Sequence, residues 1–264
     1  MCMEKMERLQ SILKEMGAAA IAFSGGVDST FLLKAAYDVL GDRCAAFTSV
    51  SPAFPKYELD QAAAFCKREG IRQICVDSKE TKLPVYRANP RDRCYHCKKA
   101  VFSKIGQEAE RMGLSFVCEG SNMDDLGDFR PGLRAIEELG IRSPLKEAGL
   151  YKEEIRALSR KLGLPTADQP SFACLATRIP YGEEITAHKL QMAEQGEALL
   201  AGLGLRQYRV RLQDKTARIE VPQEDMPVIM AHRNELVDAF RKIGFLYVTL
   251  DLEGFISGKM NREG

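Results

Sequence analysis

Short, continuously apolar runs alternate with longer amphipathic segments through most of the chain. The apolar runs lie at 18–24, 44–50, 72–78 and 115–120, with a shorter one at 141–145. Runs of this kind are typical of strands buried on both faces. The segments between them repeat apolar positions every three or four residues, which predicts helices over 4–16, 30–40, 56–70, 97–113 and 152–163. Regular alternation of strands and helices predicts an α/β fold whose parallel sheet is covered on both faces.

The pattern changes after about residue 170. Residues 171–187 have the character of a loop, interrupted by proline and glycine. A helix over about 186–202 is then followed by two alternating strands around a polar turn, a helical stretch over 224–244 and a last strand over 245–252. This order predicts a smaller α+β domain. We therefore expect an α/β domain over 1–170, a connecting loop over 171–187 and an α+β domain over 188–264.

Charge and hydropathy limit the classes of partner. The 264 residues include 38 Lys and Arg and 37 Asp and Glu, a formal net charge of +1, and residues 188–264 hold 11 basic and 11 acidic side chains. A protein that contacts many nucleic-acid phosphates carries a basic excess, so nucleic acid is not an expected partner. The charged N-terminal segment and the lack of a long apolar run predict a cytoplasmic protein with no signal peptide or membrane span.

The strongest motif joins the first apolar run to the helix after it. It reads Ser24-Gly25-Gly26-Val27-Asp28-Ser29. Paired glycines let the backbone turn sharply and bring N–H groups close to a ligand, and the positive end of the following helix attracts an anion. The two serines add hydroxyl donors, whereas the Asp28 carboxylate suits Mg²⁺ or a bound water beside a phosphate. The motif therefore predicts a phosphate-binding loop.

The hexapeptide does not match other common strand–turn–helix loops. A generic strand–turn–helix junction accounts for the glycines but not for all six residues at the end of the first strand. The chain has neither GxxxxGK[ST] nor GxGxxG, so a Walker-type or dinucleotide-binding loop is not indicated. The hexapeptide resembles the signature of the PP-loop ATP pyrophosphatase superfamily. That resemblance implies cleavage of ATP between its α and β phosphates, with the loop holding the leaving pyrophosphate.

The chain has eight cysteines. In a cytoplasmic protein they point to metal ligation or catalysis rather than to disulfides. Cys44, Cys75 and Cys118 lie in the apolar runs and are expected to be buried thiols. Cys94 and Cys97 form a CxxC motif near the start of a predicted helix, where the helix dipole favours thiolates.

A further thiol, Cys174, lies in the loop PSFACLATR and leaves several interpretations open. With Cys94, Cys97 and His96 it would make a zinc site, although structural zinc usually shows two close ligand pairs. The three cysteines alone would hold a [4Fe–4S] cluster with one iron open to an extra sulfide. Cys174 would otherwise act alone as a reactive thiol, or all three would be ordinary reduced cysteines.

Three segments together resemble the LarE family of ATP-dependent sulfur transferases. They are the hexapeptide, the run GSNMDDLGDFRPGLRAIEELGIRSPL at 120–145 and PSFACLATRIPYG at 170–182. The resemblance extends over most of residues 18–260. It implies that ATP with Mg²⁺ adenylates the carboxylates of pyridinium-3,5-biscarboxylic acid mononucleotide. Sulfur would then displace AMP and give the thiocarboxylates of the nickel-pincer cofactor of lactate racemase. The resemblance also implies a homo-oligomer.

The resemblance assigns roles residue by residue. Cys174 matches the family's sulfur-bearing cysteine, which becomes dehydroalanine in single-cysteine members. Members with three cysteines are associated with a [4Fe–4S] cluster. This chain, with Cys94, Cys97 and Cys174, matches that pattern better than the single-cysteine pattern. Lys99 matches a position that the family pattern favours, and a cation there would offset developing phosphate charge. A solvated lysine on a helix face explains Lys99 equally well.

Several more polar residues are candidates for binding. Arg178, four residues after Cys174, suits the α-phosphate or the substrate. Arg209 and Arg211 alternate along a predicted strand and so share one face; they suit the phosphate of the mononucleotide or form an outward polar face. Glu197 and Glu220 would pair with these two arginines or line an oligomer axis. The polar residues after the fourth apolar run, which suit Mg²⁺, the ribose or turn capping, are Asn122, Asp124 and Asp125.

Two further functions fit the same loop. A tRNA thiolase of this superfamily predicts RNA binding that weakens steeply with salt. A non-catalytic sensor would bind ATP at the loop without releasing pyrophosphate.

Overall fold

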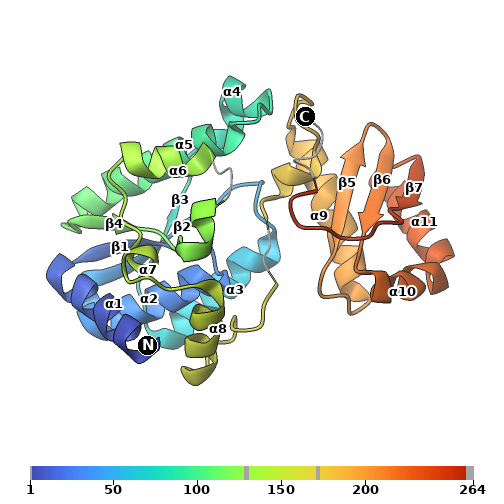
Figure 1. Cartoon of the computed structure of the whole chain (residues 1–264). Helices are drawn as coiled ribbons and strands as arrows, with labels where there is room; N and C mark the ends of the chain where they lie inside the picture. Colours follow the sequence, from blue (N-terminus) through green and yellow to red (C-terminus); the bar gives the residue numbers. More distant parts are fainter. Residues whose placement is uncertain (1, 128–130, 171–172, 260–264) are drawn as a thin grey trace. The chain divides into compact units, whose positions relative to one another are not determined.

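The structure, a computed structural model, describes residues 2–127, 131–170 and 173–259 (Figure 1). Parts of the predicted segments 120–145 and 171–187, namely 128–130 and 171–172, therefore lie outside the described residues. The chain divides into two compact units, one of residues 1–80 and 92–172 and the other of residues 81–91 and 173–264. The sequence did not predict that 81–91 belongs to the second unit. Asn89 Nδ2 ties it there by donating to the carbonyls of Ile179 and Pro180 at 3.2 and 2.6 Å.

The first unit is built on a parallel sheet of four strands in the order β3-β2-β1-β4. The strands are β1 (Ala19–Ala22), β2 (Cys44–Ser49), β3 (Gln73–Val76) and β4 (Phe116–Cys118). The longer helices around the sheet are α1 (Cys2–Met16), α2 (Val27–Leu40), α3 (Lys56–Glu69), α5 (Arg93–Arg111), α6 (Pro131–Glu138) and α8 (Lys152–Lys161). The α/β prediction with a parallel sheet is confirmed.

The predicted fifth strand at 141–145 is wrong. Only a single parallel bridge forms, between Arg142 and Cys118 of β4. The chain turns into a short helix, α7 (Pro144–Glu147), directly afterwards. Pro144 occupies the first helical position, where its missing N–H costs nothing and its fixed φ favours a helix.

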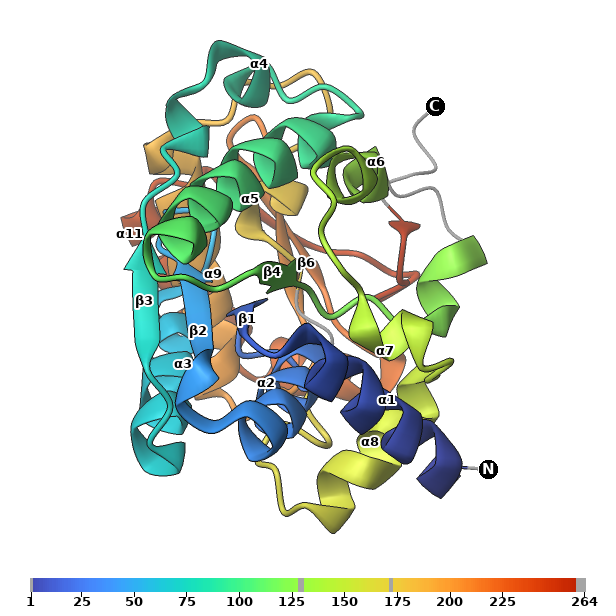
Figure 2. The same cartoon turned by 90° about the vertical axis from the view of Figure 1, so that its left-hand side faces the viewer.

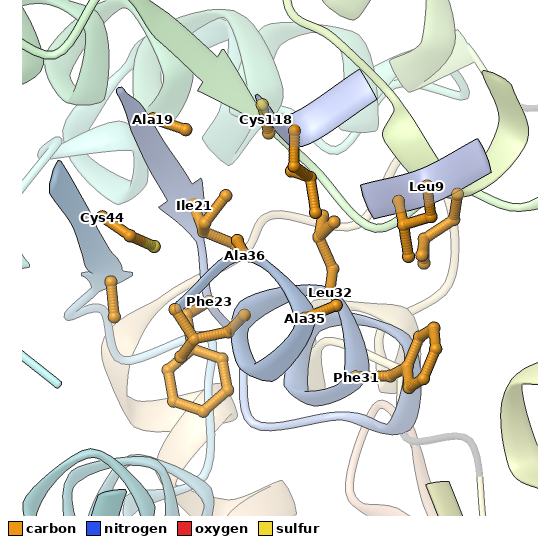
Figure 3. Close-up of a cluster of buried hydrophobic side chains, with 14 of the residues drawn as sticks. Leu9, Ala19, Ile21, Phe23, Phe31, Leu32, Ala35, Ala36, Cys44 and Cys118 are labelled. Carbon is orange, nitrogen blue, oxygen red and sulfur yellow. The ribbon is translucent and has the colours of Figure 1, made fainter. Parts of the chain in front are cut away.

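Side chains of β1 alternate between two buried clusters on opposite faces of the sheet. Ala19 and Ile21 join a cluster with helices α1, α2, α3 and α8, which includes Leu9 and Phe31 (Figure 3). Ala20 faces the second cluster, to which α5 and α6 contribute. Figure 2 shows α5 and α6 on one side of the strands and α1, α2 and α8 on the other. The continuous apolar character of β1 follows from this burial on both faces.

The thiols of the strands differ in burial. Cys44 and Cys118 are buried as predicted, but Cys75 is exposed. Cys75 lies on β3, which is an edge strand of the sheet. An edge strand is covered less completely than a central one, so an apolar run there does not ensure burial of every side chain.

The second unit contains the predicted small sheet. Its strands are β5 (Arg209–Gln213), β6 (Thr216–Glu220) and β7 (Tyr247–Leu250), in the order β5-β6-β7. The β5–β6 pair is the predicted antiparallel hairpin, and β7 pairs parallel to β6. Its helices α9 (Ala187–Gly202), α10 (Met226–Ala231) and α11 (Arg233–Ile243) include the predicted helix at 186–202 and divide the predicted stretch 224–244 in two.

Helix α9 lies close against the small sheet and α11 because Gly196 has no side chain. A Cβ atom on Gly196 would lie 2.9 Å from Phe240 Cε1 and 3.2 Å from Val210 Cγ1. The α9 N-terminus is capped by Thr186, whose hydroxyl accepts from Lys189 N at 3.2 Å. These contacts set α9 against β5, next to the segment that carries Cys174.

Candidate nucleotide-binding and thiol site

The loop between β1 and α2 has the backbone conformation that its glycines allow. Gly25 has φ of +79°, in the left-handed region, and its Cα faces α3, where an added Cβ would lie 3.4 Å from Ala62 Cβ. Gly26 is the N-cap of α2. The hydroxyls of Ser24 and Ser29 lie 3.1 Å apart, and Ser29 donates to Gly26 O at 3.2 Å. The first N–H groups of α2 have no partner within the helix and are available to an anion.

The end of β4 lies directly against this loop. A Cβ atom on Gly120 would lie 3.1 Å from Ser29 N and 3.3 Å from Asp28 C. Only glycine lets the two backbones approach this closely without a shift. The residues after β4 therefore share the carboxyl-end edge of the sheet with the loop, where α/β proteins bind ligands.

Asp28, the second residue of α2, is held on both carboxylate oxygens. Asn122 Nδ2 donates to Oδ1 at 3.2 Å, and Lys152 Nζ forms an ion pair with Oδ2. Asn122 is buried, and its own amide oxygen accepts from Asp124 N at 2.9 Å. The structure thus brings Asp28, Asn122 and Asp124 together. Lys152 was not predicted, since 124 residues separate it from Asp28 and no local pattern connects them.

These residues suit Mg²⁺ delivered with a nucleotide. Proteins commonly hold Mg²⁺ through one or two carboxylates together with substrate phosphates, rather than through a full set of protein ligands. Asp28 lies in the loop itself, and the carboxylate of Asp124 accepts from Lys152 N at 2.7 Å nearby. Within the described ranges no three His, Cys, Asp or Glu side chains gather as a metal site. A metal at Asp28 would take its remaining ligands from phosphate oxygens and water.

The two lysines after the CxxC motif leave α5 in different directions. The Lys98 side chain passes over Gly132, and its Nζ lies 3.9 Å from Glu119 Oε2, one residue before Gly120. Lys99 Nζ donates instead to Tyr95 Oη at 2.8 Å and to Glu138 at 2.9 Å. The hydrogen bonds to Tyr95 and to Glu138 both raise the pKa of Lys99. A catalytic role for Lys99 remains a prediction. Lys98 is the lysine near Glu119, whose neighbour Gly120 contacts the loop.

The CxxC motif lies in the first turns of α5, which begins four residues before the predicted start. Cys94 is exposed and Cys97 is half-buried. His96 Nε2 lies 3.4 Å from Asp92 Oδ2. The motif belongs to the first unit, whereas Cys174 belongs to the second. A common metal site of the three cysteines therefore remains a prediction.

In the second unit a buried ion pair fixes the segment that carries Cys174. Cys174 is half-buried and precedes a short 3-10 turn, Leu175–Arg178. Arg178 is 1% exposed and pairs with Glu197 of α9 through bonds of 2.7 and 2.9 Å. Its Nη1 also donates to the carbonyls of Ala173 and Cys174 at 2.8 and 3.3 Å. Glu197 further accepts from Val210 N at 3.0 Å, which ties the segment to β5.

Arg209 and Arg211 are both buried, so they do not form the outward polar face considered as one alternative. Arg211 pairs with Glu220 at 3.0 Å, which is one of the predicted pairings. Arg211 also donates to Thr177 O at 2.7 Å. Arg209 donates to Tyr208 O at 2.6 Å and lies over the Phe255 ring. Arg178 and Arg211 thus both hold the backbone of the turn after Cys174. Substrate binding by these arginines remains a prediction.

The described part of the chain contains no helix with the length and apolar character needed to cross a bilayer.

The chain resembles curated proteins over nearly its whole length. It is 46% identical to an uncharacterized protein, slr1717, of Synechocystis, over 98% of this chain and 97% of that protein. It is 34% identical to pyridinium-3,5-bisthiocarboxylic acid mononucleotide synthase of Lactiplantibacillus plantarum, over 97% of this chain and 94% of that enzyme.

More distant relatives cover a smaller share of the chain. A subunit of the glutamine-hydrolyzing GMP synthase of Thermoplasma acidophilum is 29% identical over 71% of this chain and 64% of that polypeptide. No protein-family model matches the chain.

Proposed function

The chain belongs to the LarE family of the PP-loop ATP pyrophosphatase superfamily, and from this premise we propose that it converts the carboxylates of pyridinium-3,5-biscarboxylic acid mononucleotide into thiocarboxylates at the expense of ATP. The family places it among sulfur transferases of nickel-pincer cofactor biosynthesis. The observation that carries the proposal is the 34% identity to the synthase over 97% of this chain, together with the complete SGGVDS loop.

The proposed reaction has two steps. A substrate carboxylate oxygen attacks the α-phosphorus of ATP, the bond to the bridging oxygen breaks, and pyrophosphate leaves with that electron pair. A sulfur nucleophile then attacks the acyl carbon, and AMP departs. The loop N–H groups and the α2 dipole would stabilise the leaving pyrophosphate, and Asp28 would hold Mg²⁺, which supplies charge neutralisation when bound.

Two sources of sulfur are proposed. In the first, Cys174 Sγ forms a thioester with the substrate. Loss of the Cys174 α-proton and cleavage of its Cβ–Sγ bond then leave the thiocarboxylate and dehydroalanine. In the second, Cys94, Cys97 and Cys174 would hold a [4Fe–4S] cluster, which would supply the sulfur as sulfide. The presence of Cys94 and Cys97 in a CxxC motif favours the cluster.

The test is pyrophosphate release with ATP, measured with and without the biscarboxylated mononucleotide. Release that depends on this substrate, together with sulfur in the product by mass spectrometry, is the expected result. ATP binding without pyrophosphate release would support a non-catalytic sensor. Activity on tRNA alone would favour the tRNA thiolase.

Cysteine variants separate the two sulfur sources. Cys174→Ser should abolish thiolation in both cases, while Cys75→Ser, an exposed cysteine on the edge strand, is the matched control. Cys94→Ser abolishes activity only if a cluster is required, and iron and sulfide analysis after anaerobic purification should then show about four irons per chain. Loss of the sulfur mass from Cys174 after turnover would instead support the sacrificial route.

A further inference from the structure

A carboxylate in a phosphate-binding loop presents an electrostatic problem. Asp28 lies in the first turn of α2, next to N–H groups that suit pyrophosphate. Two anions in one small site repel each other unless a cation lies between them. The structure holds such a cation in the first unit, because the Lys152 ammonium is paired with Asp28 Oδ2.

The main chain at Lys152 is fixed while its ammonium can move. Lys152 opens α8, and its N–H donates to Asp124 Oδ2 at 2.7 Å. The residue before it is held as well, since Tyr151 N donates to Glu154 Oε2 at 3.0 Å. The side chains of Lys152 and Asp28 are 27% and 24% exposed, so a ligand can reach the pair. A lysine has a flexible stem and three donors, and so exchanges partners without a backbone shift.

The surroundings distinguish this pair from an ordinary surface ion pair. Asn122 is buried and donates to the other oxygen of Asp28 at 3.2 Å. Asn122 is itself fixed, because its N–H donates to Asp125 Oδ2 at 3.0 Å. A partly exposed ion pair adds little stability by itself. A network that orients one carboxylate of the phosphate loop is better explained by ligand binding.

We propose that Lys152 is a pyrophosphate-binding residue that rests on Asp28 until the ligand arrives. When Mg²⁺ binds the Asp28 carboxylate, the Lys152 ammonium is released to the oxygens of the β- and γ-phosphates of ATP. It then stabilises the charge that the bridging oxygen gains as the bond to the α-phosphorus breaks. This inference rests on the proposed function, since it assumes that ATP is split at this loop.

Binding of inorganic pyrophosphate with Mg²⁺, measured by calorimetry, tests the assignment. Lys152→Gln should weaken binding at least tenfold, and Lys152→Arg should recover part of it. Lys161→Gln, at the far end of the same helix, removes the same charge and should bind as the wild type does. AMP lacks the β- and γ-phosphates, so its affinity should be the same in all four proteins. Equal pyrophosphate affinity of Lys152→Gln and the wild type would overturn the proposal.

A double-mutant cycle separates phosphate binding from simple neutralisation of Asp28. In the Asp28→Asn background, without Mg²⁺, no loop carboxylate needs a counter-ion. Adding Lys152→Gln should still weaken pyrophosphate binding at least tenfold, and no further loss would overturn the proposal. A wild-type protein that binds no pyrophosphate would contradict the proposed ATP chemistry itself, so the two failures are distinguishable. Thermal unfolding of each variant shows that it is folded.

Discussion

At the scale of single residues, the loop depends on one glycine conformation. Gly25 has a positive φ that residues with a Cβ adopt only at a cost of about 1–2 kcal/mol. An added Cβ would also contact α3, 3.4 Å from Ala62 Cβ. The backbone geometry of the loop is therefore set by the absence of a side chain.

Gly25→Ala should destabilise the protein by about 1–2 kcal/mol and weaken ATP binding at least tenfold, because the loop N–H groups move. Gly17→Ala is the matched control, since Gly17 has a similar φ of +71° but no atom within 4 Å of an added Cβ. Urea unfolding and calorimetry with ATP measure both effects. Equal loss of ATP affinity in the two variants would contradict a specific role for Gly25.

Burial separates the thiols by reactivity. Removal from water raises the pKa of the Cys44 and Cys66 thiols to about 12, and burial raises that of Cys118 as well. These groups stay protonated at pH 8, and the thiolate is the reactive form. Cys75 is exposed on the edge strand.

Iodoacetamide at pH 8 should therefore label Cys75 in the native protein and leave Cys44, Cys66 and Cys118 unmodified until the protein is unfolded. Because a raised thiol pKa favours the protonated form up to that pKa, raising the pH to 9 should not change this order. Peptide mass spectrometry follows the labelling. Modification of Cys118 before unfolding would show that its thiol is more accessible to solvent than in the structure.

At the scale of elements, α9 and the turn after Cys174 act together. Glu197 of α9 holds Arg178, and Arg178 holds the carbonyls of Ala173 and Cys174. Arg211 of β5 donates to the same turn at Thr177 O. The backbone around the candidate sulfur donor is therefore set by buried charges rather than by apolar packing alone.

Removing one partner of a buried ion pair leaves the other charge uncompensated, at a cost of about 3–5 kcal/mol. Glu197→Gln should show a loss of this size in urea unfolding and faster amide hydrogen exchange over 173–178. Glu194→Gln, on the same helix but less buried, should change both measurements little. Unchanged exchange in Glu197→Gln would show that the ion pair does not hold the Cys174 segment.

At the scale of the whole molecule, charge balance argues against a nucleic-acid partner. The formal net charge is +1, and the C-terminal region has as many acidic as basic residues. Several arginines of the second unit are also held in ion pairs: Arg178 pairs with Glu197, and Arg211 and Arg218 pair with Glu220.

Transfer RNA should therefore bind no better than about 10⁻⁴–10⁻⁶ M, the range of non-specific binding at physiological salt. Filter binding over a series of salt concentrations measures the affinity and its salt dependence. Tight binding that weakens steeply with salt would favour the tRNA thiolase.

The sequence alone determined the strand–helix alternation, the glycine-rich turn between β1 and α2, the small hairpin and the positions of the thiols along the chain. Each of these is a local property, since periodicity and a hexapeptide can be read within a short window. Tertiary structure decided which side chains meet. It placed Lys152 on Asp28 across 124 residues, directed Lys98 rather than Lys99 toward the end of β4, and exposed Cys75. Such pairings depend on how strands order in the sheet and how helices pack on it, which no local pattern contains.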